Sequence, residues 1–285
     1  MTGPSTILQT RDVETHIAST VGRAVPGSRS HAPILFLHGN PDSSALWHDV
    51  ITGLPEFPWV APDLPGFGRS RATPAYVQHL RDRPLETMVQ WLDEVVRQTI
   101  PEGRLHLVVH DFGGPHGLAW AVRHPDRIAS ITAIDTLFFS DYRWHFWARV
   151  WRTRILGELS MGFFSEPIFR WEMRRGSPRL TDHQLREIWE FVRWPMKRMV
   201  LQLYRATDPE VFRGWDDELR TLMGTVPSLA LWGAQDPYIH PEWAHRLGAQ
   251  RVEILDDCGH WPPLEAPDRV VEPLRDLLLE TPGAE

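Results

Sequence analysis

The feature that most constrains the fold of this chain is a regular alternation of short apolar runs with amphipathic segments. Each run is only as long as a buried strand, and the segments between runs carry apolar residues at helical spacing. Strand and helix alternating in this way predict a parallel sheet covered by helices on both faces. The runs are residues 33–39, 59–63, 104–110, 128–135, 227–232 and 251–255.

Several of the intervening segments are predicted to be helices. In residues 85–100, apolar side chains recur at three- and four-residue spacing on one face. Residues 113–124 have the same character, and a short helix is expected to begin near Ser43, whose side chain suits the amino end of a helix. A final helix that includes Val270 to Leu278 completes the pattern.

The pattern changes between Thr136 and Trp215, where the composition is helical and no strand-like run occurs. We expect a main domain of residues 1–135 and 216–285, with a helical cap of residues 136–215 inserted after the sixth strand. Ligands of open α/β sheets bind at the carboxyl ends of the strands, which such a cap would cover. We expect most cap tryptophans to attach the cap and a minority to line the pocket. Half of the 14 tryptophans lie in this segment: Trp144, Trp147, Trp151, Trp171, Trp189, Trp194 and Trp215.

Charge and cysteine content exclude several classes of protein. The 285 residues carry a net charge of −7, which argues against nucleic acid or an anionic membrane as the main partner. The single cysteine, Cys258, excludes an internal disulfide framework and suits a reducing cytoplasm. The first thirty residues lack the apolar core of a signal peptide, and no apolar stretch is long enough to span a bilayer. We therefore expect a cytoplasmic protein.

A candidate nucleophile follows the third of the six apolar runs. The sequence Val108-Val-His-Asp-Phe-Gly-Gly114 joins a predicted strand to a predicted helix, the context of a nucleophile elbow. The elbow position holds Asp111, and no Gly-x-Ser-x-Gly occurs in the chain. A carboxylate is already an anion at neutral pH and suits displacement at a saturated carbon. The alternative is an aspartate that only caps the following helix.

Five motifs in this order resemble the branch of the α/β-hydrolase superfamily that contains haloalkane dehalogenases and epoxide hydrolases. They span nearly the whole chain except the cap. The resemblance implies an α/β-hydrolase fold with a mostly parallel, eight-stranded sheet, flanking helices and a helical cap. The motifs are His38-Gly-Asn-Pro41, Asp63-Leu-Pro-Gly-Phe-Gly-Arg-Ser70, His110-Asp-Phe-Gly-Gly114, Trp232-Gly-Ala-Gln-Asp236 and Gly259-His-Trp-Pro-Pro-Leu-Glu265.

The same resemblance implies a base and an acid to accompany Asp111. His260 matches the family's catalytic histidine, which activates the water that cleaves the ester. A carboxylate should orient this histidine and stabilise its protonated form. We favour Asp236, at the commonest family position, and keep Asp135 as the reserve acid. We expect no cofactor and no metal.

Stabilisation of the leaving group decides the reaction. Backbone N–H groups near Asn40 and Phe112 are expected to form the oxyanion hole. Dehalogenases of the family bind the halide with the asparagine, here Asn40, and with a tryptophan after the nucleophile, where this chain has Phe112. Phenylalanine has no N–H, so a cap tryptophan, Trp144, Trp147 or Trp151, would have to replace that donor.

An epoxide hydrolase needs a proton donor for the opened ring instead. In that family two cap tyrosines, or a tyrosine with a histidine, have this role. Tyr204 and Tyr142 are the candidates here, with His145 as an alternative. Cap arginines could also recruit a carboxylate substrate such as a haloacid, although such a run is more often a solvated helix face: Arg170, Arg174, Arg175 and Arg179.

The leading hypothesis is therefore a haloalkane dehalogenase-like hydrolase that forms an alkyl ester on Asp111. The alternatives are an epoxide hydrolase with Tyr204 as acid, an esterase- or lactonase-like hydrolase, and a non-enzymatic ligand-binding member of the fold. The expected substrate is a small, largely apolar organic molecule that reacts with water. We expect no nucleic-acid or membrane partner, and a homodimer is compatible with the sequence.

Overall fold

The computed structural model describes residues 4–22 and 31–281. Residues 1–3, 23–30 and 282–285 lie outside the described residues. They belong to the expected main domain, and the first two ranges also belong to the thirty residues predicted to contain no signal peptide. Within the described part, none of the helices combines the length and the apolar character needed to cross a membrane.

One sheet of nine strands organises the described chain, in the order β1-β2-β4-β3-β6-β7-β8-β9, with β5 paired to β2. Neighbouring strands from β4 to β9 are parallel, whereas β1, β2 and β5 pair antiparallel. The strands are β1 (Ser5–Thr10), β2 (Val13–Ser19), β3 (Ile34–Leu37), β4 (Trp59–Pro62), β5 (Arg71–Ala72), β6 (Leu105–Asp111), β7 (Ile128–Thr136), β8 (Ser228–Gly233) and β9 (Arg251–Leu255).

All six apolar runs form strands, as predicted, and the expected α/β-hydrolase fold is confirmed. The three strands that the runs did not reveal are β1, β2 and β5. β1 lies at the edge of the sheet and is mostly exposed, so it has no buried face to produce an apolar pattern.

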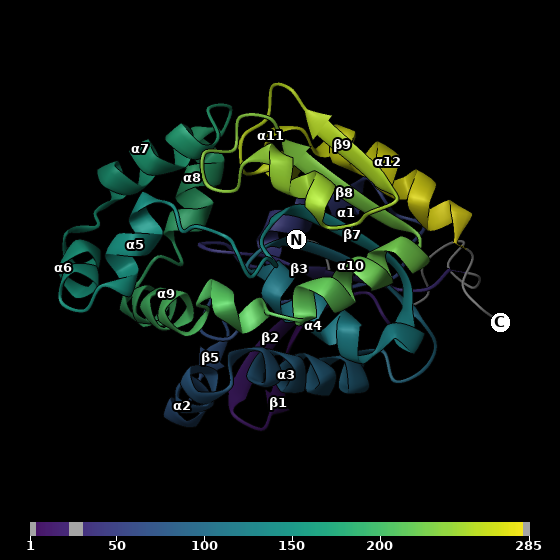
Figure 1. Cartoon of the computed structure of the whole chain (residues 1–285), viewed down its shortest axis with the longest axis horizontal. Coiled ribbons are helices and arrows are strands. Elements are labelled where there is room, and N and C mark those ends of the chain that lie inside the picture. Colours follow the sequence, from purple (N-terminus) through teal and green to yellow (C-terminus); the bar gives the residue numbers. More distant parts are fainter. Residues whose placement is uncertain (1–3, 23–30, 282–285) are drawn as a thin grey trace.

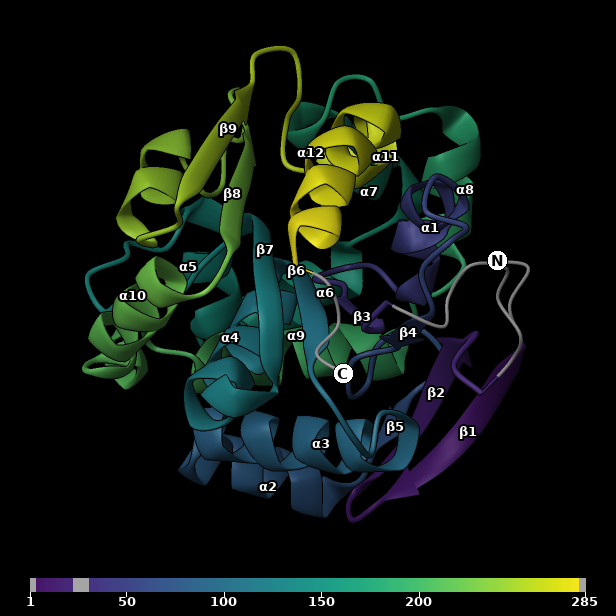
Figure 2. The same ribbon diagram turned by 90° about the vertical axis from the view of Figure 1, so that its right-hand side faces the viewer.

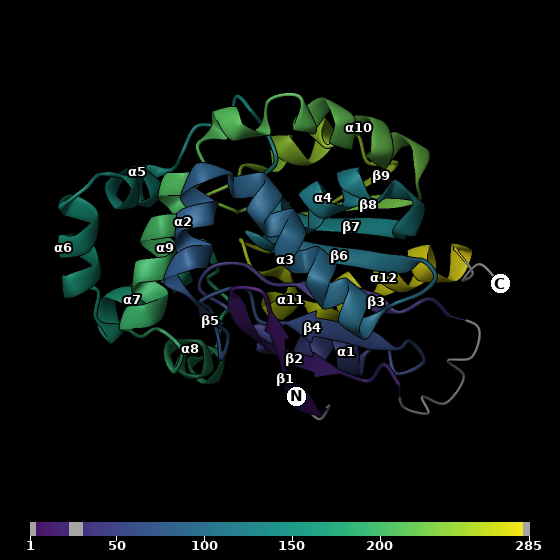
Figure 3. The ribbon, with the colours of Figure 1, turned by 90° about the horizontal axis from the view of Figure 1, so that it is seen from below.

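Helices cover both faces of the sheet (Figures 2 and 3). α3, α4 and α10 lie on one face, and α1, α11 and α12 on the other. The helices are α1 (His48–Thr52), α2 (Pro74–Asp82), α3 (Pro84–Thr99), α4 (Gly113–Arg123), α5 (Phe146–Arg152), α6 (Leu156–Phe163), α7 (Glu166–Gly176), α8 (Asp182–Trp189), α9 (Trp194–Ala206), α10 (Trp215–Thr225), α11 (Pro262–Glu265) and α12 (Pro267–Glu280), with short 3₁₀ turns η2 (Ser44–Trp47), η3 (Pro125–Arg127), η4 (Pro209–Phe212) and η5 (Pro241–Arg246).

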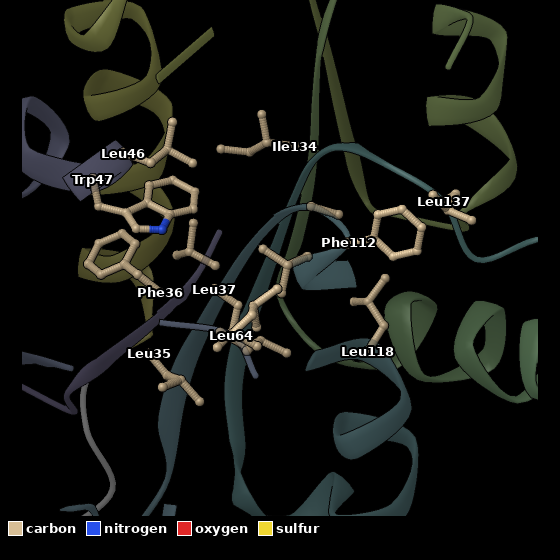
Figure 4. Close-up of a cluster of buried hydrophobic side chains, with 14 of the residues drawn as sticks. Leu35, Phe36, Leu37, Leu46, Trp47, Leu64, Phe112, Leu118, Ile134 and Leu137 are labelled. Atoms are coloured by element: carbon tan, nitrogen blue, oxygen red, sulfur yellow. The ribbon is translucent and has the colours of Figure 1, made fainter. Parts of the chain in front are cut away.

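The core lies between the sheet and these two layers (Figure 4). Every residue of β6 and β7 is buried, which agrees with the apolar residues that predominate in their sequences. On one side, the rings of Phe36 and Trp47 pack with centroids 5.1 Å apart. On the other side, Phe112 lies near Leu118 of α4 and Leu137 (Figure 4). The sheet is therefore a rigid platform for the loops at its ends.

The segment between β7 and β8 contains helices and no strand among the described residues. Helices α5 to α9 gather together beside one end of the sheet (Figure 1). α10, which begins at Trp215, instead packs against α4 of the layer that flanks the sheet. The division of the chain into a main domain and a cap stays a prediction.

Candidate active site

Asp111 occupies a tight turn between β6 and α4. Its backbone has φ +47°, in the left-handed region that a non-glycine residue adopts only with strain. The turn requires glycine at position 113, because a Cβ there would lie 2.2 Å from the carbonyl oxygen of Leu37. The Thr136 hydroxyl donates a hydrogen bond to the backbone carbonyl of Asp111 (2.6 Å). Phe112 is the N-cap residue of α4, so Asp111 does not serve as its cap.

The Asp111 carboxylate faces a backbone donor and an imidazole. The Asn40 N–H donates to Oδ1 (2.7 Å), and His260 Nε2 lies 3.5 Å from Oδ2. Burial alone would raise the pKa of Asp111, but the nearby His260 and the Asn40 N–H more than offset this, and the pKa is lowered. Asp111 is therefore an anion, as a carboxylate nucleophile must be.

His260 lies in the loop between β9 and α11, and three bonds hold it in place. Its Nδ1–H donates to Asp236 Oδ2 (2.7 Å), and its backbone N–H donates to the carbonyl of Gly176 at the end of α7 (3.0 Å). His110 Nε2–H donates to the His260 carbonyl (2.7 Å) and so supports this loop from β6. Burial alone would lower the pKa of His260, but Asp236 and Asp111 raise it well above its ordinary value.

Both candidate acids lie beside His260. Asp236 accepts the hydrogen bond of His260 Nδ1–H on Oδ2. It also accepts the backbone N–H groups of Tyr238 (2.7 Å) and Ile239 (3.1 Å) on Oδ1. Asp135, at the carboxyl end of β7, accepts the N–H of Gly233 (3.1 Å) and is fully buried. A carboxylate oxygen of Asp135, a carboxylate oxygen of Asp236 and a ring nitrogen of His260 lie within 4.8 Å of one another.

A cavity opens above Asp111 and joins the sheet end to the helices of the segment between β7 and β8. Its wall is mostly apolar and aromatic, with contributions from α5, α6, α7 and α9. The predicted residues that line the cavity are Asn40, Asp111, Tyr142, Trp144, His145, Trp151, Tyr204 and His260.

Phe112 and Trp147, two further predicted residues, do not line the cavity. The ring of Phe112 is fully buried and stacks behind Trp144, with centroids 6.2 Å apart. Of the cap tryptophans, only Trp144 and Trp151 reach the cavity wall. Trp171 and Trp194 are more than half exposed, and the expectation that most of these tryptophans attach a cap stays a prediction.

The cavity holds three groups that can donate to a leaving group. The indole Nε1–H of Trp144 is buried and has no acceptor among the described residues. Tyr204 is buried, and its pKa is raised, first by burial and then by the charge on Asp111, so its hydroxyl keeps its proton. The side chain of Asn40 also lines the cavity.

The other predicted donors are less available. The Tyr142 hydroxyl donates to the carbonyl of Tyr238 (2.7 Å), so its proton is already used. His145 accepts the N–H of Ala148 (3.4 Å) at the start of α5, and burial lowers the pKa of its imidazole to about 4. His145 is therefore neutral at pH 7.

The four cap arginines that could have bound a carboxylate substrate do not line the cavity. Arg170 and Arg174 both pair with Asp182, and Arg179 pairs with Asp257. Arg175 pairs with Glu172, whose side chain is 10% exposed and does line the cavity. Among the described residues of the cavity wall there is no lysine or arginine.

Sequence reasoning missed Glu172 and Tyr238. The Tyr238 hydroxyl donates to Glu172 Oε1 (2.8 Å), and its ring packs against His260 with centroids 5.1 Å apart. Position was the one signal that could have found Tyr238, because it lies in the loop that carries Asp236. Nothing in the helical pattern of α7 distinguishes Glu172 from a surface residue.

Comparison with known proteins agrees with this geometry. Residues 32–161 match the family model described as the alpha/beta hydrolase fold. Epoxide hydrolase 3 of Xenopus tropicalis is 26% identical over 278 residues, which cover 89% of this chain and 73% of that protein. Haloalkane dehalogenase 2 of Mycobacterium bovis is 28% identical over 269 residues, which cover 84% of this chain and 85% of that protein.

Among solved structures, the Cif epoxide hydrolase from Acinetobacter nosocomialis matches with a TM-score of 0.80 and 19% identity, over 98% of this chain and 90% of that chain. At this identity the likeness shows the fold alone. The comparisons confirm the resemblance to the α/β-hydrolase superfamily, and both reactions left open by the sequence occur among the relatives.

Proposed function

Because this chain is a hydrolase with the α/β-hydrolase fold, we propose that it hydrolyses the carbon–halogen bond of small, uncharged organic molecules through an ester on Asp111. The observation that carries the choice of reaction is the unpartnered indole N–H of Trp144. Asn40 is one side-chain N–H donor to the halide, and the indole of Trp144 is the second donor, which Phe112 cannot supply. The helices of residues 136–215 act as the cap that excludes solvent.

In the first half-reaction, the Asp111 carboxylate attacks the carbon that bears the halogen. A carbon–oxygen bond forms as the carbon–halogen bond breaks, and the halide leaves with the bonding electron pair. Donors aimed at the departing halide lower the barrier because negative charge develops on it in the transition state. Trp144 and Asn40 are these donors.

In the second half-reaction, water cleaves the ester. His260 Nε2 takes a proton from water, and the hydroxide formed attacks the ester carbon of Asp111. The Asn40 N–H, which is 2.7 Å from Oδ1, stabilises the oxyanion. Collapse breaks the bond to the alkyl oxygen, which leaves as an alkoxide and takes up a proton to become the alcohol. The overall reaction converts the organic halide and water into the alcohol, a halide ion and a proton.

His260 can act as a base only after the charge around it changes. Asp111 holds the pKa of the imidazole up while the carboxylate is ionised. Esterification removes that negative charge, so the pKa of His260 falls and the neutral base becomes available. Asp236 keeps Nδ1 protonated and leaves Nε2 free to accept the proton of water.

Tyr204 favours a second candidate function, the hydrolysis of an epoxide to a vicinal diol. Its buried, protonated hydroxyl lies in the cavity, where the opened ring would need a proton. Asp111, His260 and Asp236 would act as in the first mechanism. Two alternatives are weaker. In an esterase- or lactonase-like enzyme Asp111 would act as a base or form an anhydride, and simple ligand binding has no need of the set of Asp111, His260 and Asp236.

A trapping experiment tests the proposal. His260→Gln removes the base, so the Asp111 ester should accumulate and be seen by intact mass spectrometry after incubation with a bromoalkane or an epoxide. A bromoalkane adduct that lacks bromine supports the dehalogenase, and an adduct with the full mass of the epoxide supports the epoxide hydrolase. His183→Gln, which changes an exposed histidine outside the cavity, is the matched control and should turn over without accumulating an adduct. No adduct with either class would contradict the covalent mechanism.

A further inference from the structure

We infer that Asp135 and Asp236 act as one acid that shares a single proton, with Asp135 as a positioning residue that can take over the negative charge beside His260. This inference rests on the proposed role of His260 as base. It concerns how the two buried carboxyl groups divide one charge, and it therefore predicts a functional overlap between them.

The first step is the closeness of the three groups. One carboxylate oxygen each of Asp135 and Asp236 and one ring nitrogen of His260 lie within 4.8 Å of one another. Asp135 and Asp236 are 0% and 4% exposed, and His260 is 2% exposed. Two carboxylates this close cannot both be ionised at such burial without a large cost, so one proton is retained between them.

The second step is the location of that proton. Asp236 accepts three N–H groups, from His260, Tyr238 and Ile239, whereas Asp135 accepts only the Gly233 N–H among the described residues. Hydrogen bonds from N–H groups stabilise the ionised form, so the negative charge resides mainly on Asp236. Burial and the charge on Asp236 raise the pKa of Asp135 well above its usual range, and Asp135 holds the proton.

The third step is the backbone at Asp135. Its φ is +36°, in the left-handed region, although it ends a fully buried β-strand. A non-glycine residue keeps such a conformation only where the surrounding structure compensates for the strain. Here the strained turn at the end of β7 directs the Asp135 carboxyl group to the Gly233 N–H and towards Asp236.

These observations predict that either acid alone can sustain the base. If Asp236 is replaced by asparagine, Asp135 loses its anionic neighbour and can ionise close to His260. If both are replaced, no carboxylate remains on the Nδ1 side of the ring to orient Nδ1–H, and Asp111 alone is left to stabilise the imidazolium. Other charged or titratable groups near His260 are Asp111, Asp42, His110, His145 and Tyr238, and they are the same in every variant.

The decisive measurement is the imidazole pKa of His260, followed by NMR in the full-length protein. It should stay above its ordinary value in Asp135→Asn and in Asp236→Asn, and fall clearly below the pKa of either single variant in the double variant, where only Asp111 still opposes the effect of burial. A His260 pKa that is as low in Asp236→Asn as in the double variant would overturn the inference. Because no substrate is present, this result is independent of whether the protein cleaves halides or epoxides.

Turnover gives the second readout. With a bromoalkane or an epoxide, whichever is the substrate, Asp236→Asn should lose about tenfold in kcat, and the double variant about a thousandfold, because His260 acts after the ester has formed. Equal losses in Asp236→Asn and the double variant would show that Asp135 has no positioning role. Far-UV circular dichroism and thermal unfolding establish that each variant is folded, and Asp257→Asn, at an exposed carboxylate, is the matched control.

Discussion

The indole of Trp144 stacks on the ring of Phe112, with centroids 6.2 Å apart and planes inclined by 18°. Phe112 follows Asp111 directly in the sequence, and Trp144 comes from the segment after β7. Phe112, directly after the proposed nucleophile, thus supports the indole of Trp144. The N–H donor that Phe112 lacks comes from Trp144, which is distant in the sequence.

Removal of this N–H should weaken the halide-releasing step. Trp144→Phe keeps the stacking on Phe112 but loses the donor, so kcat/KM for a bromoalkane should fall by about tenfold to a hundredfold, the size expected for one hydrogen bond to a charged group. Trp171→Phe, at a tryptophan outside the cavity, is the control. Bromide release in a steady-state assay measures the effect. Equal activities of the two variants would refute the assignment of Trp144.

Tyr204 separates the two candidate reactions. Tyr204→Phe removes the proton donor, so an epoxide hydrolase should lose about a hundredfold or more in turnover. A dehalogenase that uses Trp144 and Asn40 should lose no more than about tenfold. The control is Tyr76→Phe, because the buried Tyr76 hydroxyl lies outside the cavity and has no partner among the described residues.

The charge of Asp111 should control the protonation of His260. Asp111→Asn removes a negative charge that lies 3.5 Å from Nε2, so the imidazole pKa of His260 should decrease from its raised value. In the wild type, cleavage of the ester should accelerate with rising pH, because the neutral imidazole is the active form. NMR titration of the variant checks the first expectation, and single-turnover rates check the second. An unchanged pKa in Asp111→Asn would argue against this coupling.

The cavity should discriminate against carboxylate substrates. Glu172 lines its wall, and none of the described lining residues is a lysine or an arginine. We expect 3-bromopropanamide to be processed better than 3-bromopropionate, and Glu172→Gln to raise the acid-to-amide ratio of kcat/KM by about tenfold because one negative charge is removed. Glu166→Gln, in the same helix but outside the cavity, is the control. If Glu172→Gln leaves the acid-to-amide ratio of kcat/KM unchanged, Glu172 does not discriminate against carboxylate substrates.

Asp63 should contribute to stability in a pH-dependent manner. It accepts the N–H groups of Ser44 (2.6 Å) and Arg69 (2.8 Å) and pairs with His16 (3.0 Å). Although burial opposes ionisation, these contacts lower the pKa of Asp63 from 3.8 to about 2. The stabilisation is therefore complete above pH 3.8 and is lost as the pH falls towards 2, and it amounts to about 2 kcal/mol. Urea unfolding of the wild type and of Asp63→Asn at pH 7 should differ by about this amount, and an equal stability would contradict the assignment.

The sequence by itself determined the sheet that carries the site. Buried parallel strands need continuous apolar runs, and all six runs are strands in the structure. The same local reasoning identified Asp111, because a tight strand-to-helix turn requires the glycines that follow it, and the motifs identified His260 and its two candidate acids. The strands β1 and β5 escaped detection because they are largely exposed or very short. The buried strand β2 escaped it because polar Thr15 and His16 interrupt its apolar residues.

Only the tertiary structure decided which distant side chains meet at the cavity. The sequence offered three tryptophans and two tyrosines as donors and preferred Tyr204. Packing brings Trp144, Trp151, Tyr142 and Tyr204 to the cavity but commits the Tyr142 hydroxyl to a backbone carbonyl. It also brings Asp135 and Asp236 together beside His260, and places Glu172 on the cavity wall. The physical reason is that local patterns record which residues are buried, while the partner of a buried polar group depends on how separate elements pack.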